Sequence, residues 1–159
     1  MERVHALRER ELFARYHAAG SPYWVPYQFD HPDDAGPANS VMVLDGPDGI
    51  IGTLRLDRLP ARIGAVRLVA VDSGMAGRGL GRLMTEQLVT LAEREGLSSL
   101  VVNAQGEAAG FYVKMGFRRS VWPGMSADVR AVPMLLPLRV PHDADLQTVL
   151  SDLRDFAVA

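Results

Sequence analysis

The stretch AVDSGMAGRGLGRLM, residues 70–84, decides the fold that this sequence predicts. It begins as the end of a buried strand near Val71, and it continues as a turn with glycines at positions 74, 77, 79 and 81. Glycines let a backbone approach a ligand closely, and a helix N-terminus carries orphan N–H groups and partial positive charge. The turn therefore predicts a site for a phosphate or pyrophosphate, and Arg78 and Arg82 add positive charge beside it.

A long amphipathic helix is predicted directly after this turn, over residues 78–95, and Gly96 suits the position just past its end. Its apolar residues recur at three- and four-residue steps: Leu80, Leu83, Met84, Leu88, Leu91 and Ala92. Around it, the patterns predict a helix over 2–19, a hairpin of strands 41–44 and 50–56, strands over 65–71 and 97–104, a short helix over 107–115 ended by Gly116, and a strand pair over 117–122 and 129–138. This order predicts a mixed α/β layer structure.

Two better-known phosphate motifs do not fit the turn. The Walker pattern requires a lysine after its last glycine, and Leu80 follows Gly79 instead. The dinucleotide fingerprint is G-x-G-x-x-G, whereas the glycines at 77, 79 and 81 are spaced G-x-G-x-G. From this segment alone, a strand–helix turn that needs glycines for its backbone and binds nothing is an equal alternative.

A second segment, VVNAQGEAAGFYVKMGFRR at 101–119, favours the ligand-binding interpretation of the turn. Together with AGRGLG it resembles the GNAT superfamily of acyl-CoA-dependent N-acetyltransferases. The phosphate loop of that family, Arg/Gln-x-x-Gly-x-Gly/Ala, is matched by Ala76, Gly77, Arg78, Gly79, Leu80 and Gly81. Its second signature, roughly Asn-x-x-Ala-x-x-Phe-Tyr-x-Lys-x-Gly-Phe, is matched by Gln105, Ala108, Phe111, Tyr112, Lys114, Gly116 and Phe117. Ala76 departs from the usual Arg or Gln, and Gln105 stands where Asn is common; the resemblance covers about residues 41–138.

The resemblance implies a mostly antiparallel central sheet with one splayed parallel strand pair and helices on both faces, over residues 1–140. From residue 141 to 159 we expect an amphipathic helical tail that packs on this domain or on a second copy, so a homodimer is one expected arrangement. The tail's apolar residues fall on one helical face: Leu146, Val149, Leu150, Leu153 and Phe156.

By the same resemblance, acetyl-CoA is the expected co-substrate, its pantetheine arm pairing with exposed backbone of the splayed strands. The residues expected to contact it are Val69, Ala70, Val71, Ala76, Gly77, Arg78, Gly79, Leu80, Gly81, Arg82, Asn103, Gln105, Phe111, Tyr112 and Lys114. The backbone N–H of Val71 or Asp72 is expected to receive the developing oxyanion. Lys114 is equally well a surface lysine, and Phe111 is more simply a core residue.

Transfer to an amine needs an acid for the departing thiolate and a base for the ammonium. Tyr112 stands where the family often places its general acid, and a phenol near pKa 10 is close to a thiol near 8.5. Asp72 is one candidate base and Asp57 another; a water chain to solvent serves equally well. As the simpler alternative, Tyr112 is a half-buried aromatic and both aspartates are solvated loop acids.

The acceptor amine is expected at the segment after the first helix, against Tyr23, Trp24, Tyr27 and Asp30, with Asp33 and Asp34 nearby. Aromatic faces and carboxylates suit a small cationic amine. Alternatively the aromatics cap the sheet and the acids are solvated. His31 among these acids fits no strong metal template, so no metal is predicted.

The composition of the chain excludes several classes of function. Seventeen lysines and arginines against nineteen acids give a net charge of −2, which argues against nucleic-acid binding. The absence of cysteine excludes thiolate chemistry, and no apolar run is long enough for a membrane span. The charged N-terminus is unlike a secretory signal, so a cytoplasmic protein is expected.

Three hypotheses follow: an N-acetyltransferase acting on a primary amine of a small molecule or peptide, a non-catalytic acyl-CoA-binding module, or a structural protein without ligand.

Overall fold

The computed structural model describes residues 1–14, 17, 20, 26–124 and 130–139. The predicted tail at 141–159 lies outside these residues, as do Tyr23 and Trp24. The chain divides into two compact units, which are described separately. Unit 1 comprises Met1–Asp57 and Arg67–Met84, and unit 2 comprises Arg58–Val66 and the chain from Thr85 onward.

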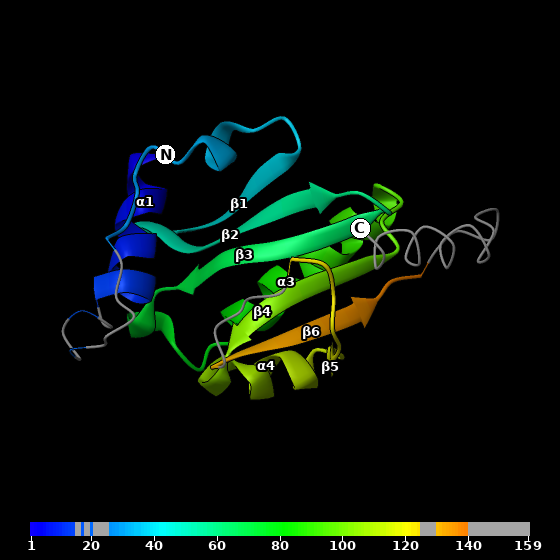
Figure 1. The fold of residues 1–159 in the computed structure, drawn as a ribbon. Coiled ribbons are helices and arrows are strands. Elements are labelled where there is room, and N and C mark those ends of the chain that lie inside the picture. Colours follow the sequence, from blue (N-terminus) through cyan, green and yellow to red (C-terminus); the bar gives the residue numbers. More distant parts are fainter. Residues whose placement is uncertain (15–16, 18–19, 21–25, 125–129, 140–159) are drawn as a thin grey trace. The chain divides into compact units, whose positions relative to one another are not determined.

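The described residues form a six-stranded sheet in the order β1-β2-β3-β4-β6-β5 (Figure 1). Its strands are β1 Asn39–Gly46, β2 Gly49–Leu59, β3 Ile63–Val71, β4 Ser99–Gln105, β5 Arg118–Arg119 and β6 Ala131–Pro137. β1 with β2, β4 with β6, and β5 with β6 pair antiparallel, whereas β3 and β4 pair parallel. The parallel ladder ends at Val66 opposite Val102, although both strands continue beyond it. The predicted mixed, mostly antiparallel sheet with one parallel pair is confirmed.

The N-terminal helix of unit 1 differs from its prediction. An α-helix, α1, covers Glu2–Arg8, and a π-helical turn, η1, follows over Glu9–Ala14. A short 3-10 helix, η2, covers Pro32–Ala35, where the sequence predicts only loop. The α-helix predicted over 2–19 is therefore wrong over Glu9–Ala14, because the spacing of apolar residues does not distinguish an α-helical turn from a π-helical one. The buried apolar side chains of this unit include Val4, Leu7, Leu54, Leu56 and Ala70.

Helix α3 runs over Leu80–Arg94, close to its predicted bounds. Met84, Leu88 and Ala92, four residues apart, are buried, whereas the predicted apolar position Leu83 is 42% exposed. Gly96 ends the helix with φ +74°, and Leu97 N–H donates to the Ala92 carbonyl at 2.9 Å. This glycine-terminated C-cap confirms the prediction for Gly96.

The second half of unit 2 is built around β4 and β6. A 3-10 turn, η4, covers Gly106–Ala108, and helix α4 covers Ala109–Lys114. Gly116, with φ +92°, ends this helix as predicted. The predicted strand over 117–122 shortens to the two residues of β5. Ile63, Ala65, Val101 and Trp122 form a buried cluster in this unit.

Candidate active site

The glycine turn lies within unit 1 and begins directly after β3. Asp72 N–H donates to the Ile51 carbonyl on β2 at 2.9 Å, and the Asp72 carboxylate accepts from Gly74 N–H at 2.8 Å. This cap starts a 3-10 turn, η3, over Ser73–Met75. The turn therefore leaves the sheet from a position fixed by β2 and by its own side-chain cap.

Gly77 and Gly79 explain why the turn needs glycine. Both have φ +76°, a backbone conformation that costs other residues about 1–2 kcal/mol. A Cβ added at either position would meet nothing within 4 Å, so these glycines do not serve close packing. The residues from Ala76 to Gly79 are exposed, and the space beside the two glycines is open.

Helix α3 begins where the turn ends. Its first turn is closed by Leu83 N–H donating to the Gly79 carbonyl at 3.0 Å. The positive end of the helix dipole is therefore beside the exposed turn, and the Arg78 side chain is exposed there as well. Left-handed glycines, open space and a helix N-terminus together fit a pyrophosphate group.

The end of β3 is irregular at Leu68, which has φ +50° although it is not glycine. Ala70 is buried, and Val69 and Val71 are half-buried. Because Asp72 N–H is already paired with β2, it is not available to an oxyanion. Of the two predicted donors, Val71 N–H therefore stays the candidate for the oxyanion.

The Asp72 carboxylate has two partners besides solvent. Its Oδ2 accepts from Arg10 Nη2 at 2.8 Å, its Oδ1 caps Gly74, and the side chain is 30% exposed. Each carboxylate oxygen has two lone pairs, so Asp72 keeps acceptor capacity beside these two contacts. Asp57, the other candidate, accepts from Arg55 Nε at 2.6 Å and from Arg67 Nε at 3.2 Å.

Tyr112 lies in unit 2, on α4, and is 6% exposed. Its ring packs edge-on against Phe111 and Phe117, with centroids 5.2 Å away in each case. Burial raises the pKa of Tyr112 to about 12. The phenol is therefore protonated at neutral pH and able to donate, but its pKa lies well above that of a thiol, about 8.5, so the two values do not match as predicted.

The other predicted contacts in unit 2 surround the end of β4. Asn103 Nδ2 donates to the Gly124 carbonyl at 3.3 Å, and its buried Oδ1 has no hydrogen-bond partner in the part of the chain described. Gln105 and Lys114 are exposed, and Phe111 is half-buried. The predicted cofactor residues thus fall into two groups, one in each unit.

Two of the acids near the predicted acceptor site, Asp33 and Asp34, are bound by arginines. Asp34 accepts from Arg8 Nη1 at 2.7 Å and from Arg55 Nη1 at 3.2 Å, while Arg55 also donates to Asp33 at 3.2 Å. Arg8 is 0% exposed and Arg55 4%. Burial acts to raise the pKa of Asp34, but hydrogen bonds and charge from both arginines outweigh it and hold that pKa below its ordinary value. Among these predicted acids, Asp30 is exposed.

Sequence reasoning missed both arginines. Their signal was a charged residue at an apolar position: Arg8 follows Leu7 on the buried side of α1, and Arg55 and Asp57 share one face of a buried strand. Residues two apart on a strand face the same side, so an arginine and an aspartate there form a pair. The charges of Asp33 and Asp34 are neutralised within unit 1.

Tyr27 belongs to a cluster of rings in unit 1. Its hydroxyl lies 2.6 Å from His5 Nδ1, and its ring centroid lies 4.9 Å from those of Phe13 and Phe29. Phe29 is 51% exposed, so the cluster keeps an apolar face toward solvent.

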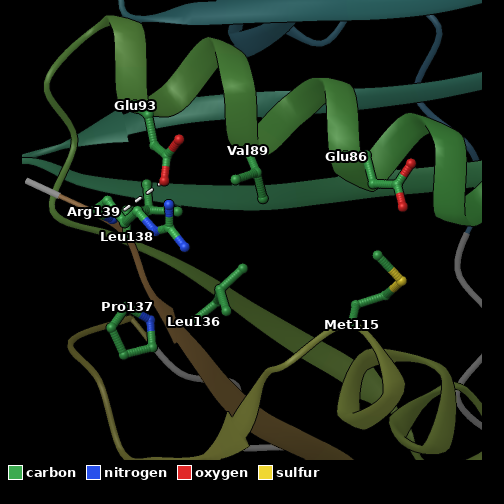
Figure 2. Close-up of a pocket in the computed structure, with 8 residues that line it drawn as sticks. All are labelled: Glu86, Val89, Glu93, Met115, Leu136, Pro137, Leu138 and Arg139. Atoms are coloured by element: carbon green, nitrogen blue, oxygen red, sulfur yellow. Dashed lines mark hydrogen bonds between the residues drawn. The ribbon is translucent and has the colours of Figure 1, made fainter.

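A hollow of about 340 Å³ lies in unit 2, and none of the residues that line it was predicted for the site (Figure 2). It is lined by Glu86, Val89, Glu93, Met115, Leu136, Pro137, Leu138 and Arg139. Glu93 points toward Arg139 and accepts its backbone N–H at 3.2 Å.

Metal ligands do not gather in the described part of the chain, where no three His, Asp or Glu residues are grouped to hold an ion. His31 Nδ1 accepts the Asp33 N–H at 3.2 Å. No helix among these residues is long and apolar enough to cross a membrane.

The mixed sheet and the left-handed glycine turn at the N-terminus of α3 define the class of this protein as α/β, with an exposed turn between β3 and α3. The family model described as "Acetyltransferase (GNAT) domain" matches residues 32–138, and the chain belongs to this family.

Relatives and solved structures agree with this assignment. N-alpha-acetyltransferase RimI of Mycobacterium tuberculosis is 33% identical over 123 residues, covering 75% of this chain and 76% of that protein. Glucosamine 6-phosphate N-acetyltransferase 1 of rice is 41% identical over 56 residues, which cover 35% of this chain and 34% of that protein. The match to a Bacillus subtilis relative covers 46% of that relative's length. Tetrahymena GCN5 superposes with TM-score 0.70 at 18% identity over 91% of both chains. The Escherichia coli ribosomal-protein-S18-alanine N-acetyltransferase gives 0.63 at 16%, over 91% of this chain and 92% of that one, and both structures show the fold alone.

Proposed function

We propose that this protein transfers an acetyl group from acetyl-CoA to a primary amine of a small molecule or peptide. The observation that carries the proposal is the exposed turn with Gly77 and Gly79 in left-handed conformation at the start of α3. Backbone and helix dipole there suit the pyrophosphate of acetyl-CoA. Family membership and the acetyltransferase names of its relatives support the same reaction.

In the proposed reaction the neutral amine nitrogen attacks the thioester carbonyl carbon. A C–N bond forms, the C–S bond breaks, and CoA leaves as a thiolate. Val71 N–H stabilises the oxyanion that develops on the carbonyl oxygen. The Tyr112 hydroxyl donates its proton to the thiolate and is reprotonated by solvent, and the amine proton leaves to Asp72 or to a water chain. The raised pKa of Tyr112 keeps the phenol neutral at pH 7, so that it holds a proton to donate, although it is a weaker acid than an ordinary tyrosine.

The acceptor is proposed as a primary amine at the aromatic cluster of Tyr27, with Asp30 as the exposed acid. Relatives named for an amino-sugar phosphate and for protein N-termini both act on primary amines. The pairing of Asp33 and Asp34 with arginines gives no support to a cation site at those two acids.

A non-catalytic acyl-CoA-binding module is the second candidate. The raised pKa of Tyr112 favours it, because a phenol of higher pKa is a weaker acid toward the departing thiolate.

Release of the CoA thiol, followed with a thiol reagent, distinguishes the two candidates. The panel contains an amino-sugar phosphate, a polyamine, a peptide N-terminus and a buffer without amine. Amine-dependent release is expected from the wild type, and Tyr112→Phe should lower it about tenfold or more with acetyl-CoA affinity unchanged. Binding of acetyl-CoA without release by any amine would favour the module, and equal turnover in Tyr112→Phe would remove Tyr112 from the mechanism.

A further inference from the structure

The π-helical turn Glu9–Ala14 contacts the start of the glycine turn through two side chains. Arg10 Nη2 donates to Asp72 Oδ2 at 2.8 Å, and Glu11 Oε1 accepts from Ser73 N–H at 3.2 Å and from Ser73 Oγ at 3.3 Å. All of these residues belong to unit 1, as does the glycine turn itself.

These contacts form one chain of hydrogen bonds. Arg10 Nε also donates to Glu11 Oε1 at 2.8 Å, so this single oxygen accepts from three donors. The Asp72 carboxylate extends this network, because it also accepts a hydrogen bond from Gly74 N–H. Ionised partners make such bonds shorter and stronger than neutral ones. The Glu11 side chain is 11% exposed, which limits competition from water.

The middle of the turn has few side chains that could fix its position. Ala76 has no polar side chain, and Gly77 and Gly79 have open space where a Cβ would be. The backbone amides at its start, on Ser73 and Gly74, are instead bonded to Glu11 and Asp72. The start of the turn is therefore held partly by its own Asp72 cap and partly by Glu11 and Arg10 of the π-helical turn, a type of turn that is frequent at functional sites.

We propose that Glu11 and Arg10 are positioning residues that hold the glycine turn in its acyl-CoA-binding conformation. They touch neither acetyl group nor amine, and they act through Ser73 and Asp72. The inference rests on the proposed function, because it assigns affinity for acyl-CoA to that turn. Loosening the turn weakens binding of acetyl-CoA and leaves the chemical step intact.

The test compares Glu11→Ala with Glu9→Ala, which removes an exposed acid from the same π-helical turn. Glu11→Gln keeps an acceptor for Ser73, and Arg10→Ala removes the contact to Asp72 from a side chain that is 56% exposed. Acetyl-CoA affinity is measured by calorimetry, kcat and KM by CoA release, and amide hydrogen exchange reports on Ser73 and Gly74. A thermal melt verifies that each variant is folded.

Glu11→Ala should raise the Kd and KM for acetyl-CoA about tenfold, with kcat within about twofold of the wild type. Exchange at Ser73 and Gly74 should accelerate, Glu11→Gln should be intermediate, and Glu9→Ala should match the wild type. If Glu11→Ala fails to fold, Arg10→Ala provides the same comparison with a smaller expected effect.

Wild-type affinity and exchange in folded Glu11→Ala or Arg10→Ala would overturn the inference, and so would a fall in kcat at unchanged KM. A wild type that does not bind acetyl-CoA would instead refute the proposed function, and the role of Glu11 in binding would fail with it.

Discussion

Asparagine at position 34 should destabilise the protein far more than asparagine at position 33. Both substitutions remove one negative charge and keep the side-chain size. Asp34 is the one acidic partner of Arg8 in the described residues, and Arg8 is 0% exposed. Asp33 is 48% exposed; its carboxylate contacts Arg55, which keeps Asp57 and Asp34 as partners, and lies 3.6 Å from Nδ1 of the exposed His31.

The magnitude follows from this difference in burial. Asp34→Asn leaves Arg8 as an uncompensated buried charge, at a cost of about 3–5 kcal/mol. Asp33→Asn breaks an exposed contact and costs about 0–1 kcal/mol. At about 2–4 °C per kcal/mol for a chain of this size, a difference of about 3 kcal/mol separates the two melting temperatures by about 6–12 °C.

Urea unfolding at neutral pH measures the difference, and the pH dependence checks its cause. A depressed pKa means that ionised Asp34 contributes stability above its unfolded pKa, about 3.9, and loses it as pH falls through the folded value. The gap between wild type and Asp34→Asn should therefore close in acid. Adding Arg8→Met to Asp34→Asn should recover stability, because no unpaired charge is then buried at position 8. Equal stability of the two asparagine variants would refute the assignment of Asp34 to structure and return it to the acceptor site.

Three further predictions test the glycine turn, the proposed general acid and the core. Gly79→Ala should lower the free energy of unfolding by about 1–2 kcal/mol and weaken acetyl-CoA binding in calorimetry, because the φ of Gly79 is +76°. Gly110→Ala in α4 is the control, because the space around Gly110 is equally open, and it should not lower stability; equal effects of the two substitutions would count against a conformational role for Gly79. The raised pKa of Tyr112 means that the neutral phenol stabilises the folded state below the unfolded pKa near 10, and that this contribution is lost as pH rises toward about 12. The free energies of unfolding of wild type and Tyr112→Phe in urea should therefore diverge only in alkali. Gly52→Ala should cost about 1–3 kcal/mol in thermal unfolding, because the new Cβ would lie 2.5 Å from Met84 Sδ, and an unchanged melting temperature would show that Met84 repacks freely.

The parts of the fold that were predictable depend on local rules. Helix α3 shows apolar residues at helical spacing and a glycine where left-handed backbone ends it, and α4 ends at Gly116 in the same way. The glycine turn was recognisable because two of its glycines adopt a conformation that other residues avoid.

The parts that escaped prediction depend on tertiary contacts. Ala61 and Arg62 have φ +59° and +57° in the turn between β2 and β3, although neither is a usual turn residue. Arg62 is held there because its Nε donates to the Gly96 carbonyl at 2.6 Å and its own carbonyl accepts from Ser98 N–H at 2.8 Å. No local sequence pattern contains those partners.

The candidate site shows the same division. The turn and Tyr112 were found through sequence motifs, whereas the contacts of Asp72 and Asp34 with Arg10 and Arg8 join residues far apart in the chain. The acidic cluster therefore suggested a cation site from the sequence, and only the structure reveals the arginines that neutralise part of it.

Calorimetric titration with acetyl-CoA and with acetyl-pantetheine, which lacks the pyrophosphate, tests the central claim most directly. If the glycine turn binds the pyrophosphate, acetyl-CoA should bind with micromolar affinity and acetyl-pantetheine about a hundredfold more weakly, a difference of about 2.7 kcal/mol. Equal affinity for the two compounds, or no binding of acetyl-CoA at millimolar concentration, would contradict the account.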